Sequence, residues 1–153
     1  MTSTENALIT AGTVDLDLTA TSKDQAVESL AQRLVDAGRV TDIEQFLVDI
    51  ALREEQMPTG LEGGIGIPHC RSVAVTQPSL AFGRSTAGID FGAPDGPADL
   101  IFLIAAPADG GSEHMTVLAA LARRLVRKAF KQELRDATDP AAIATYVQTE
   151  VGQ

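Results

Sequence analysis

Residues 63–71, Gly-Gly-Ile-Gly-Ile-Pro-His-Cys-Arg, hold a histidine in a constrained stretch of backbone. Glycines adopt conformations closed to other residues and let another segment or a ligand come close. Pro68 fixes its own φ, lacks an N–H donor and biases Ile67 towards an extended conformation. His69 is therefore expected at the end of a short extended segment. A neutral imidazole is nucleophilic and can carry a phosphoryl group, so His69 is a candidate phosphoryl carrier, although a lone histidine is more often structural.

The chain has one other histidine, His114. We expect it in the first turn of a helix that follows a buried strand, where free N–H groups and the positive end of the helix dipole attract anions. Taken alone, His114 is equally a polar residue near a helix start. Both histidines are expected where strands run out into loops, which is where α/β sheets build binding sites. The pair therefore predicts a single site.

Other chemistries fit these residues poorly. A metal site needs three or four converging ligands, and the two histidines and Cys70 show no ligand spacing. Cys70 directly follows His69, so in an extended chain the two side chains point to opposite faces. We interpret Cys70 as a small buried residue rather than a nucleophile. The sequence contains no Gly-x-Ser-x-Gly elbow, Walker A loop or dinucleotide fingerprint.

The composition is that of an acidic chain with an aliphatic core. Of 153 residues, 44% are hydrophobic but only 4% are aromatic, and tryptophan is absent. A net charge of −9 argues against nucleic acid and anionic membrane surfaces as partners. The single cysteine excludes an internal disulfide. No apolar run approaches the roughly 20 residues of a membrane span, and the first residues do not resemble a secretory signal, so we expect a soluble cytoplasmic protein.

The hydrophobic pattern alternates between strand and helix periods. Strands are expected at residues 14–18, 79–83 and 100–106, and the last of these is hydrophobic enough to be buried on both faces. Glycine- and proline-rich loops are expected at residues 56–66 and 86–98. Capping residues indicate three helix starts, which are Ser22 with Gln25, Thr41 with Glu44, and Asp139 with Pro140. A further helix is expected to open at His114. These elements predict a single α/β domain with a mixed, mostly parallel sheet of about five strands flanked by helices on both faces.

The same residues resemble a known family. Residues 64–69, Gly-Ile-Gly-Ile-Pro-His, are similar to the phosphorylation-site motif of the fructose/mannitol-type enzyme IIA domain of the bacterial phosphoenolpyruvate-dependent sugar phosphotransferase system. Arg53, in an Arg-Glu-Glu context, falls at the arginine this family keeps beside its active histidine; by itself it is a cation that complements a helix dipole. His114, in Glu-His-Met-Thr-Val-Leu, falls at the family's second active-site histidine. The resemblance covers nearly the whole chain, so one domain is assigned to residues 1–153.

The resemblance is closest to the fructose-specific branch and implies a mechanism. The phosphocarrier protein HPr would donate a phosphoryl group to His69, through Nε2, and His69 would pass it to a cysteine of the cognate enzyme IIB for fructose uptake through enzyme IIC. His114 would stabilise the phosphoryl group and Arg53 would neutralise its charge, with no cofactor and no metal. Enzymes IIB and IIC are expected partners, either separate or joined to this chain, and would tether it to the inner face of the membrane. Gly66 and Cys70 depart from the residues usual in the family, so the motif does not define the sugar specificity sharply.

Two alternatives remain open. The first is a regulatory binding module on the same scaffold, controlled by phosphorylation of His69. The second is a small-molecule binding domain with two incidental histidines.

Overall fold

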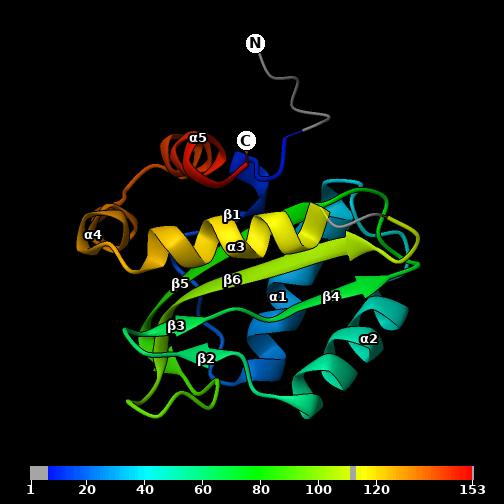
Figure 1. Cartoon of the computed structure of the whole chain (residues 1–153), viewed down its shortest axis with the longest axis horizontal. Coiled ribbons are helices and arrows are strands. Elements are labelled where there is room, and N and C mark those ends of the chain that lie inside the picture. The colour runs from blue at the N-terminus through cyan, green and yellow to red at the C-terminus, as the bar shows by residue number, and fades with distance from the viewer. Residues whose placement is uncertain (1–6, 111–112, 153) are drawn as a thin grey trace.

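The computed structural model describes residues 7–110 and 113–152, apart from the side chains of residues 113 and 114. A mixed sheet of six strands forms its centre (Figure 1). The strands run in the order β1-β5-β6-β3-β2, and β4 pairs with β6 beyond the end of β3. The strands are β1 (Val14–Asp15), β2 (Gly60–Leu61), β3 (Ile65–Gly66), β4 (His69–Ser72), β5 (Ser79–Ile89) and β6 (Ala98–Pro107).

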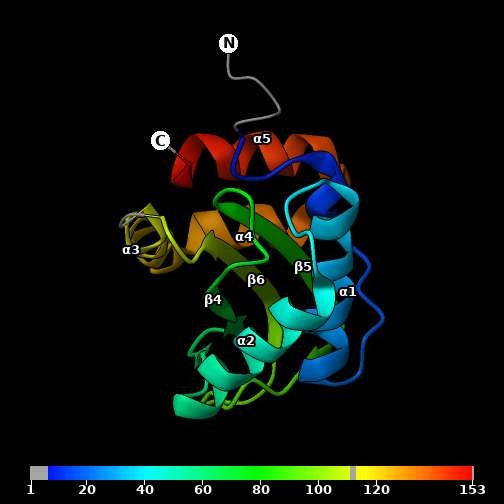
Figure 2. The ribbon, with the colours of Figure 1, turned by 90° about the vertical axis from the view of Figure 1, so that its right-hand side faces the viewer.

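Helices cover both faces of this sheet, as Figure 2 shows from the side. One layer is formed by α1 (Lys23–Asp36) and α2 (Ile43–Gln56), which follow a short 3₁₀ turn at Ala11–Thr13. The other layer is formed by α3 (Glu113–Leu125), α4 (Lys128–Asp136) and α5 (Pro140–Val151). Pairs β1–β5, β3–β6 and β4–β6 are parallel, whereas β5–β6 and β2–β3 are antiparallel. The predicted α/β class is confirmed, with six strands where about five were expected.

Strand β6 separates two hydrophobic cores. Leu100, Phe102 and Ile104 pack towards α3, α4 and α5, whereas the alternate residues Ile101 and Leu103 pack towards α1 and α2. All of them are at most 2% exposed. The predicted burial of this strand on both faces is confirmed, and it makes β6 the fixed reference against which β3 and β4 are placed.

Of the predicted helix caps, the one for α2 is wrong by one residue. The Ser22 side chain accepts a hydrogen bond from the backbone amide of Gln25, as predicted for α1. For α2 the cap is Asp42, whose carboxylate accepts from the backbone amide of Gln45 at 3.2 Å. Thr41, the predicted cap, instead donates its hydroxyl to the carbonyl of Ala74 at 3.1 Å.

Two predicted loops contain strand structure. Residues 56–66 include the hairpin of β2 and β3, which turns at Gly63 and Gly64 with φ of 94° and 80°. Strand β5 continues to Ile89 because β6 offers it a pairing partner from Ala98 onward, with a register shift in between. In both places tertiary pairing outweighs a glycine-rich composition that locally favours a loop. None of the helices in the described ranges is both long and apolar enough to cross a bilayer.

Candidate functional site

His69 is the first residue of β4. It pairs with Ile104 of β6 in parallel register, and the Ile104 amide donates to the carbonyl of Pro68 at 3.0 Å. The prediction that His69 lies where a strand exits into a loop was therefore wrong in detail. The residue follows the end of β3 by three positions but belongs to the next strand, so the ladder to β6 fixes its backbone.

The imidazole ring of His69 is oriented by its own backbone. Nδ1 lies 2.8 Å from the carbonyl oxygen of Ile67, two residues earlier. A carbonyl can only accept, so Nδ1 carries the proton and donates it. In the neutral ring the lone pair is then on Nε2. The half-buried ring is therefore held in the tautomer in which Nε2 is the nucleophilic nitrogen.

A hollow of about 540 Å³ runs along β4 between α2 and α3 and contains His69. Edge strand β4 forms its floor, and the two helices form its walls. It is lined by Asp49, Leu52, Arg53 and Gln56 of α2, by His69, Cys70 and Arg71 of β4, and by Met115 and Leu118 of α3.

Arg53 lies in the wall of this hollow, half-buried in the last turn of α2. Its one described hydrogen bond runs from Nη1 to the carbonyl of Met57 at 3.3 Å. It forms no ion pair with any described residue. The nearest carboxylate along the helix in the same hollow, Asp49, accepts from Ser72 Oγ at 2.6 Å and from Gln45 Nε2 at 3.0 Å. The positive charge of Arg53 is therefore left without a paired carboxylate in the described structure.

Arg71 is a second cation in the hollow, and it was not among the residues predicted from the sequence. Its Nη2 donates to the carbonyl oxygens of Ala108 at 2.9 Å and Gly110 at 2.6 Å. The signal was available, because residues two apart on a strand share a face, and Arg71 follows His69 by two. Within the described part of the chain, Arg71 also has no carboxylate partner.

The Cys70 side chain packs on the other face of β4 from His69, as predicted, and only its edge borders the hollow. It is 8% exposed and packs in the core beneath α1 and α2. Burial, with a smaller contribution from the charge of Asp49, raises the pKa of its thiol to about 12. At pH 7 only about one thiol in 10⁵ would be ionised, so Cys70 is unsuited to nucleophilic chemistry.

His114 occupies the second position of α3, so its backbone lies in a helical first turn as predicted. Its side chain falls outside the described residues. The next residue, Met115, and Leu118 one turn on both line the hollow. The first turn of α3 therefore borders the site, while a contact between His114 and the His69 ring stays a prediction.

A second hollow, of about 380 Å³, lies between α1 and α2 with Pro68 in its wall. Its buried carboxylate, Glu54, is already engaged: it accepts from the amide and the hydroxyl of Thr59, both at 2.8 Å, and lies 3.7 Å from Lys23 Nζ. Glu54 thus holds the chain that enters β2. This engagement makes it a structural carboxylate.

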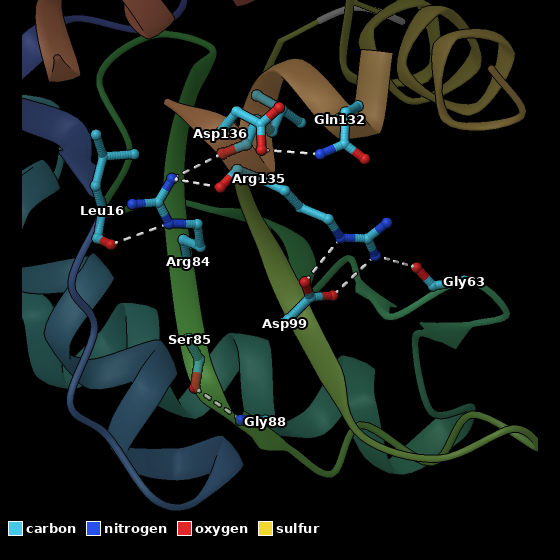
Figure 3. A network of polar contacts seen from close by, with 10 residues as sticks. Leu16, Gly63, Arg84, Ser85, Gly88, Asp99, Gln132, Arg135 and Asp136 are labelled. Carbon is cyan, nitrogen blue, oxygen red and sulfur yellow. Dashed lines mark hydrogen bonds and ion pairs between the residues drawn. The ribbon is translucent and has the colours of Figure 1, made fainter. Parts of the chain in front are cut away.

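The glycine turn before His69 is held by an arginine of α4 (Figure 3). Arg135 of α4 forms a two-point ion pair with Asp99 of β6, at 2.8 and 2.9 Å, and donates to the carbonyl of Gly63 at 2.7 Å. The amide of Asp99 in turn donates to the carbonyl of Gly64 at 3.0 Å. Because the turn opens directly into β3, these contacts fix the start of the segment that carries His69.

Arg84 of β5 anchors the helix that provides Arg135. Its Nη1 donates to the carbonyls of Leu134, Arg135 and Ala137 at the end of α4, at 2.7–3.1 Å, and its Nε donates to the carbonyl of Leu16 (Figure 3). A cation at a helix C-terminus also complements the helix dipole. Arg84 therefore fixes the end of α4 to the sheet, and with it the backbone of Arg135, whose side chain contacts the glycine turn.

Residues 7–150 match the EIIA 2 family of the phosphoenolpyruvate-dependent sugar phosphotransferase system. A similar relative is the fructose-specific EIIA component of this system from Haloferax volcanii, 42% identical over 125 residues, which is 81% of each chain. The fructose-specific EIIABC component of Bacillus subtilis is 34% identical over 89% of this chain. This chain spans only 22% of the length of that relative.

Solved structures show the same fold. The nitrogen regulatory protein IIA-Ntr from Neisseria meningitidis superposes with a TM-score of 0.83 at 28% identity, over 92% of this chain and 96% of that one. Enzyme IIA of the Escherichia coli mannitol system, in complex with phosphorylated enzyme IIB, gives a TM-score of 0.75 at 25% identity, over 94% and 96% of the two chains.

Proposed function

Because the chain belongs to the EIIA 2 family of the phosphoenolpyruvate-dependent sugar phosphotransferase system, we propose that His69 is the residue on which it carries the phosphoryl group. The observation that carries this proposal is the hydrogen bond from Nδ1 to the Ile67 carbonyl, which leaves the lone pair on Nε2 in a hollow that also contains Arg53 and Arg71. The family match from residue 7 to residue 150 supports assigning residues 1–153 to one such domain.

In the proposed reaction Nε2 of His69 attacks the phosphorus of phospho-HPr. The new N–P bond forms as the donor's N–P bond breaks, and the electron pair of that bond returns to the donor imidazole. Nδ1 keeps its proton throughout, held by the Ile67 carbonyl. Phosphoryl transfer asks little of a protein beyond positioning and charge stabilisation, which Arg53 would supply and His114 would support from the positive end of α3.

The phosphoryl group would next pass to a cysteine of an enzyme IIB. The solved complex of the mannitol enzyme IIA, which shares this fold, with phosphorylated enzyme IIB supports an enzyme IIB as the partner. The fructose-specific relatives favour fructose as the sugar and a membrane-bound enzyme IIC as its route, with this chain on the cytoplasmic side. No cofactor is required by this chemistry.

A second candidate is a regulatory role for the same phosphohistidine. The likeness to the nitrogen regulatory protein IIA-Ntr favours it, because that protein shares the fold at 28% identity. In this case phosphorylation of His69 would change the affinity of the chain for a regulatory partner, and no enzyme IIB would accept the group.

The test is the intact mass of the protein after incubation with phosphoenolpyruvate, enzyme I and HPr. We expect one acid-labile phosphoryl group on the wild type and none on His69→Ala. His114→Ala should fold and accept the group more slowly. A wild type that stays unlabelled beside active carriers would overturn the phosphocarrier proposal, and an unchanged rate for His114→Ala would remove that residue from the site.

Adding a fructose-type enzyme IIB to the phosphorylated protein separates the two candidates. Loss of label from the protein and its appearance on the IIB cysteine supports sugar transport. Label that stays on His69 with every IIB tried supports the regulatory role.

A further inference from the structure

Arg71 holds the chain that leaves β6. Its Nη2 donates to the carbonyls of both Ala108 and Gly110, two of the three residues described between the end of β6 and residue 111. The amide of Ala108 also donates to the carbonyl of Ser72, next to Arg71 in β4, at 3.1 Å. Strand β4 thus fixes the exit of β6 through one side-chain and one backbone contact.

This arrangement is informative because Arg71 is an exposed residue. A long exposed side chain loses about 2 kcal/mol of conformational freedom when it is held in one place. Two carbonyl contacts from one nitrogen, 2.9 and 2.6 Å long, offset this loss. Both bonds end on the segment that joins β6 to the helix carrying His114.

We infer that Arg71 is a positioning residue for phosphoryl transfer: it fixes the exit of β6 and thereby sets the first turn of α3 against the hollow that contains His69. The inference rests on the proposed function of His69. Arg71 acts through the loop and His114, and not by contact with the phosphoryl group.

A positioning role predicts a specific dependence on His114. In a double-variant cycle, residues that act through one another are not additive. Arg71→Ala should slow transfer from saturating phospho-HPr by about tenfold, because small misplacements of catalytic groups have effects of this size or larger. In a His114→Ala background the same change should slow it less than about twofold. Arg71→Lys, which keeps a cation with several donors, should recover most of the rate.

The matched control is Arg123→Ala, which removes an exposed arginine from the last turn of α3, outside the hollow. It reports the effect of net charge alone on docking, which should appear in the KM for phospho-HPr. A second readout does not depend on transfer. Amide hydrogen exchange at Ala108 and Gly110 should speed up in Arg71→Ala and not in Arg123→Ala.

Each outcome decides one point. If Arg71→Ala and Arg123→Ala behave alike in both assays, Arg71 has no positioning role. If the effects of Arg71→Ala and His114→Ala multiply, Arg71 acts on the phosphoryl group directly and the inference is wrong. If the wild type is never phosphorylated, the proposed function fails, and with it this inference, whatever the exchange shows.

Discussion

The segment from the glycine turn to the end of β4 has arginines near both ends, but the two ends differ in what neutralises their charge. At the glycine turn, Arg135 is paired through two nitrogens with Asp99. At the hollow, the hydrogen bonds described for Arg53 and Arg71 end on neutral backbone carbonyls. An arginine paired with a carboxylate adds little net charge to its surroundings, whereas an arginine held by neutral carbonyls keeps its positive charge. In a chain of net charge −9, Arg53 and Arg71 therefore make the surroundings of His69 locally positive, and Arg53 is the one expected to contact an anion there.

The largest expected effect is at the glycine turn, where Arg135 is paired with Asp99. Gly64→Ala would require φ of about 80° for a residue with a side chain, and its Cβ would collide with the Asp99 carboxylate and press on Arg135. We expect the free energy of unfolding to fall by about 2–4 kcal/mol, the sum of backbone strain and a weakened ion pair. Urea unfolding followed by circular dichroism measures it.

Gly38→Ala is the matched control for this substitution. Gly38 has a similar φ of 76°, but nothing lies within 4 Å of the added Cβ. It should lose only about 1–2 kcal/mol, the cost of backbone strain. Equal losses in the two variants would show that the ion pair does not stabilise the turn, and the contrast between the two ends would fail.

The next effect is at the hollow. Arg53→Ala should slow phosphorylation of His69 by about a hundredfold, because it removes a charge that stabilises the transferring group. The melting temperature should change little, since Arg53 donates one long hydrogen bond. Rapid-quench transfer from phospho-HPr and differential scanning calorimetry measure the two quantities.

Arg135→Ala should lower the stability of the protein more than it lowers the transfer rate. Its ion pair is about one-third exposed, so we expect a loss of about 1–2 kcal/mol of stability. Its effect on the transfer rate should be smaller than that of Arg53→Ala. If Arg53→Ala unfolds the protein and leaves the transfer rate per folded molecule unchanged, Arg53 has a structural role like that of Arg135.

The smallest effect concerns Cys70, the residue after His69 in β4. With a pKa of about 12, its thiol stays protonated in the native protein well above the pH at which an ordinary cysteine ionises. We expect no alkylation by iodoacetamide between pH 7 and 9 in the folded state and complete alkylation in urea. The unfolded chain releases this proton near pH 9 and the folded chain does not, so stability from this group falls as pH rises above about 9.

Rapid labelling of the folded protein at pH 7 would contradict this expectation. It would mean that the thiol reaches the solvent of the hollow. His69 and Cys70 would then no longer lie on chemically separate faces of β4.

Local signals predicted those features whose partners are close in sequence. Ser22 caps α1 with the amide of Gln25, and the long apolar run predicted a strand buried on both faces. Thr41 shows the limit of such reasoning. Its local pattern matches a helix cap, but its hydroxyl is taken by the carbonyl of Ala74, 33 residues away.

The same limit applies to the candidate site. Motif and family resemblance indicated His69, Arg53 and His114, but the contacts of Arg71 are with the distant carbonyls of Ala108 and Gly110. The tautomer of His69 depends on how Ile67 turns its carbonyl. The glycine turn is held by Arg135, 72 residues away, which no local pattern connects to it.

The two ends of the described chain meet on the far side of the molecule. The amides of Leu8 and Ile9 both donate to Oε1 of Gln148 in α5, at 2.7 and 3.3 Å. Helix α5 lies towards the β1 edge of the sheet, whereas β4 lies towards the opposite edge (Figure 1). The hollow that contains His69 is lined by β4 and therefore lies on that side. Both ends of the described chain therefore leave the fold beside α5, away from the edge strand that carries His69.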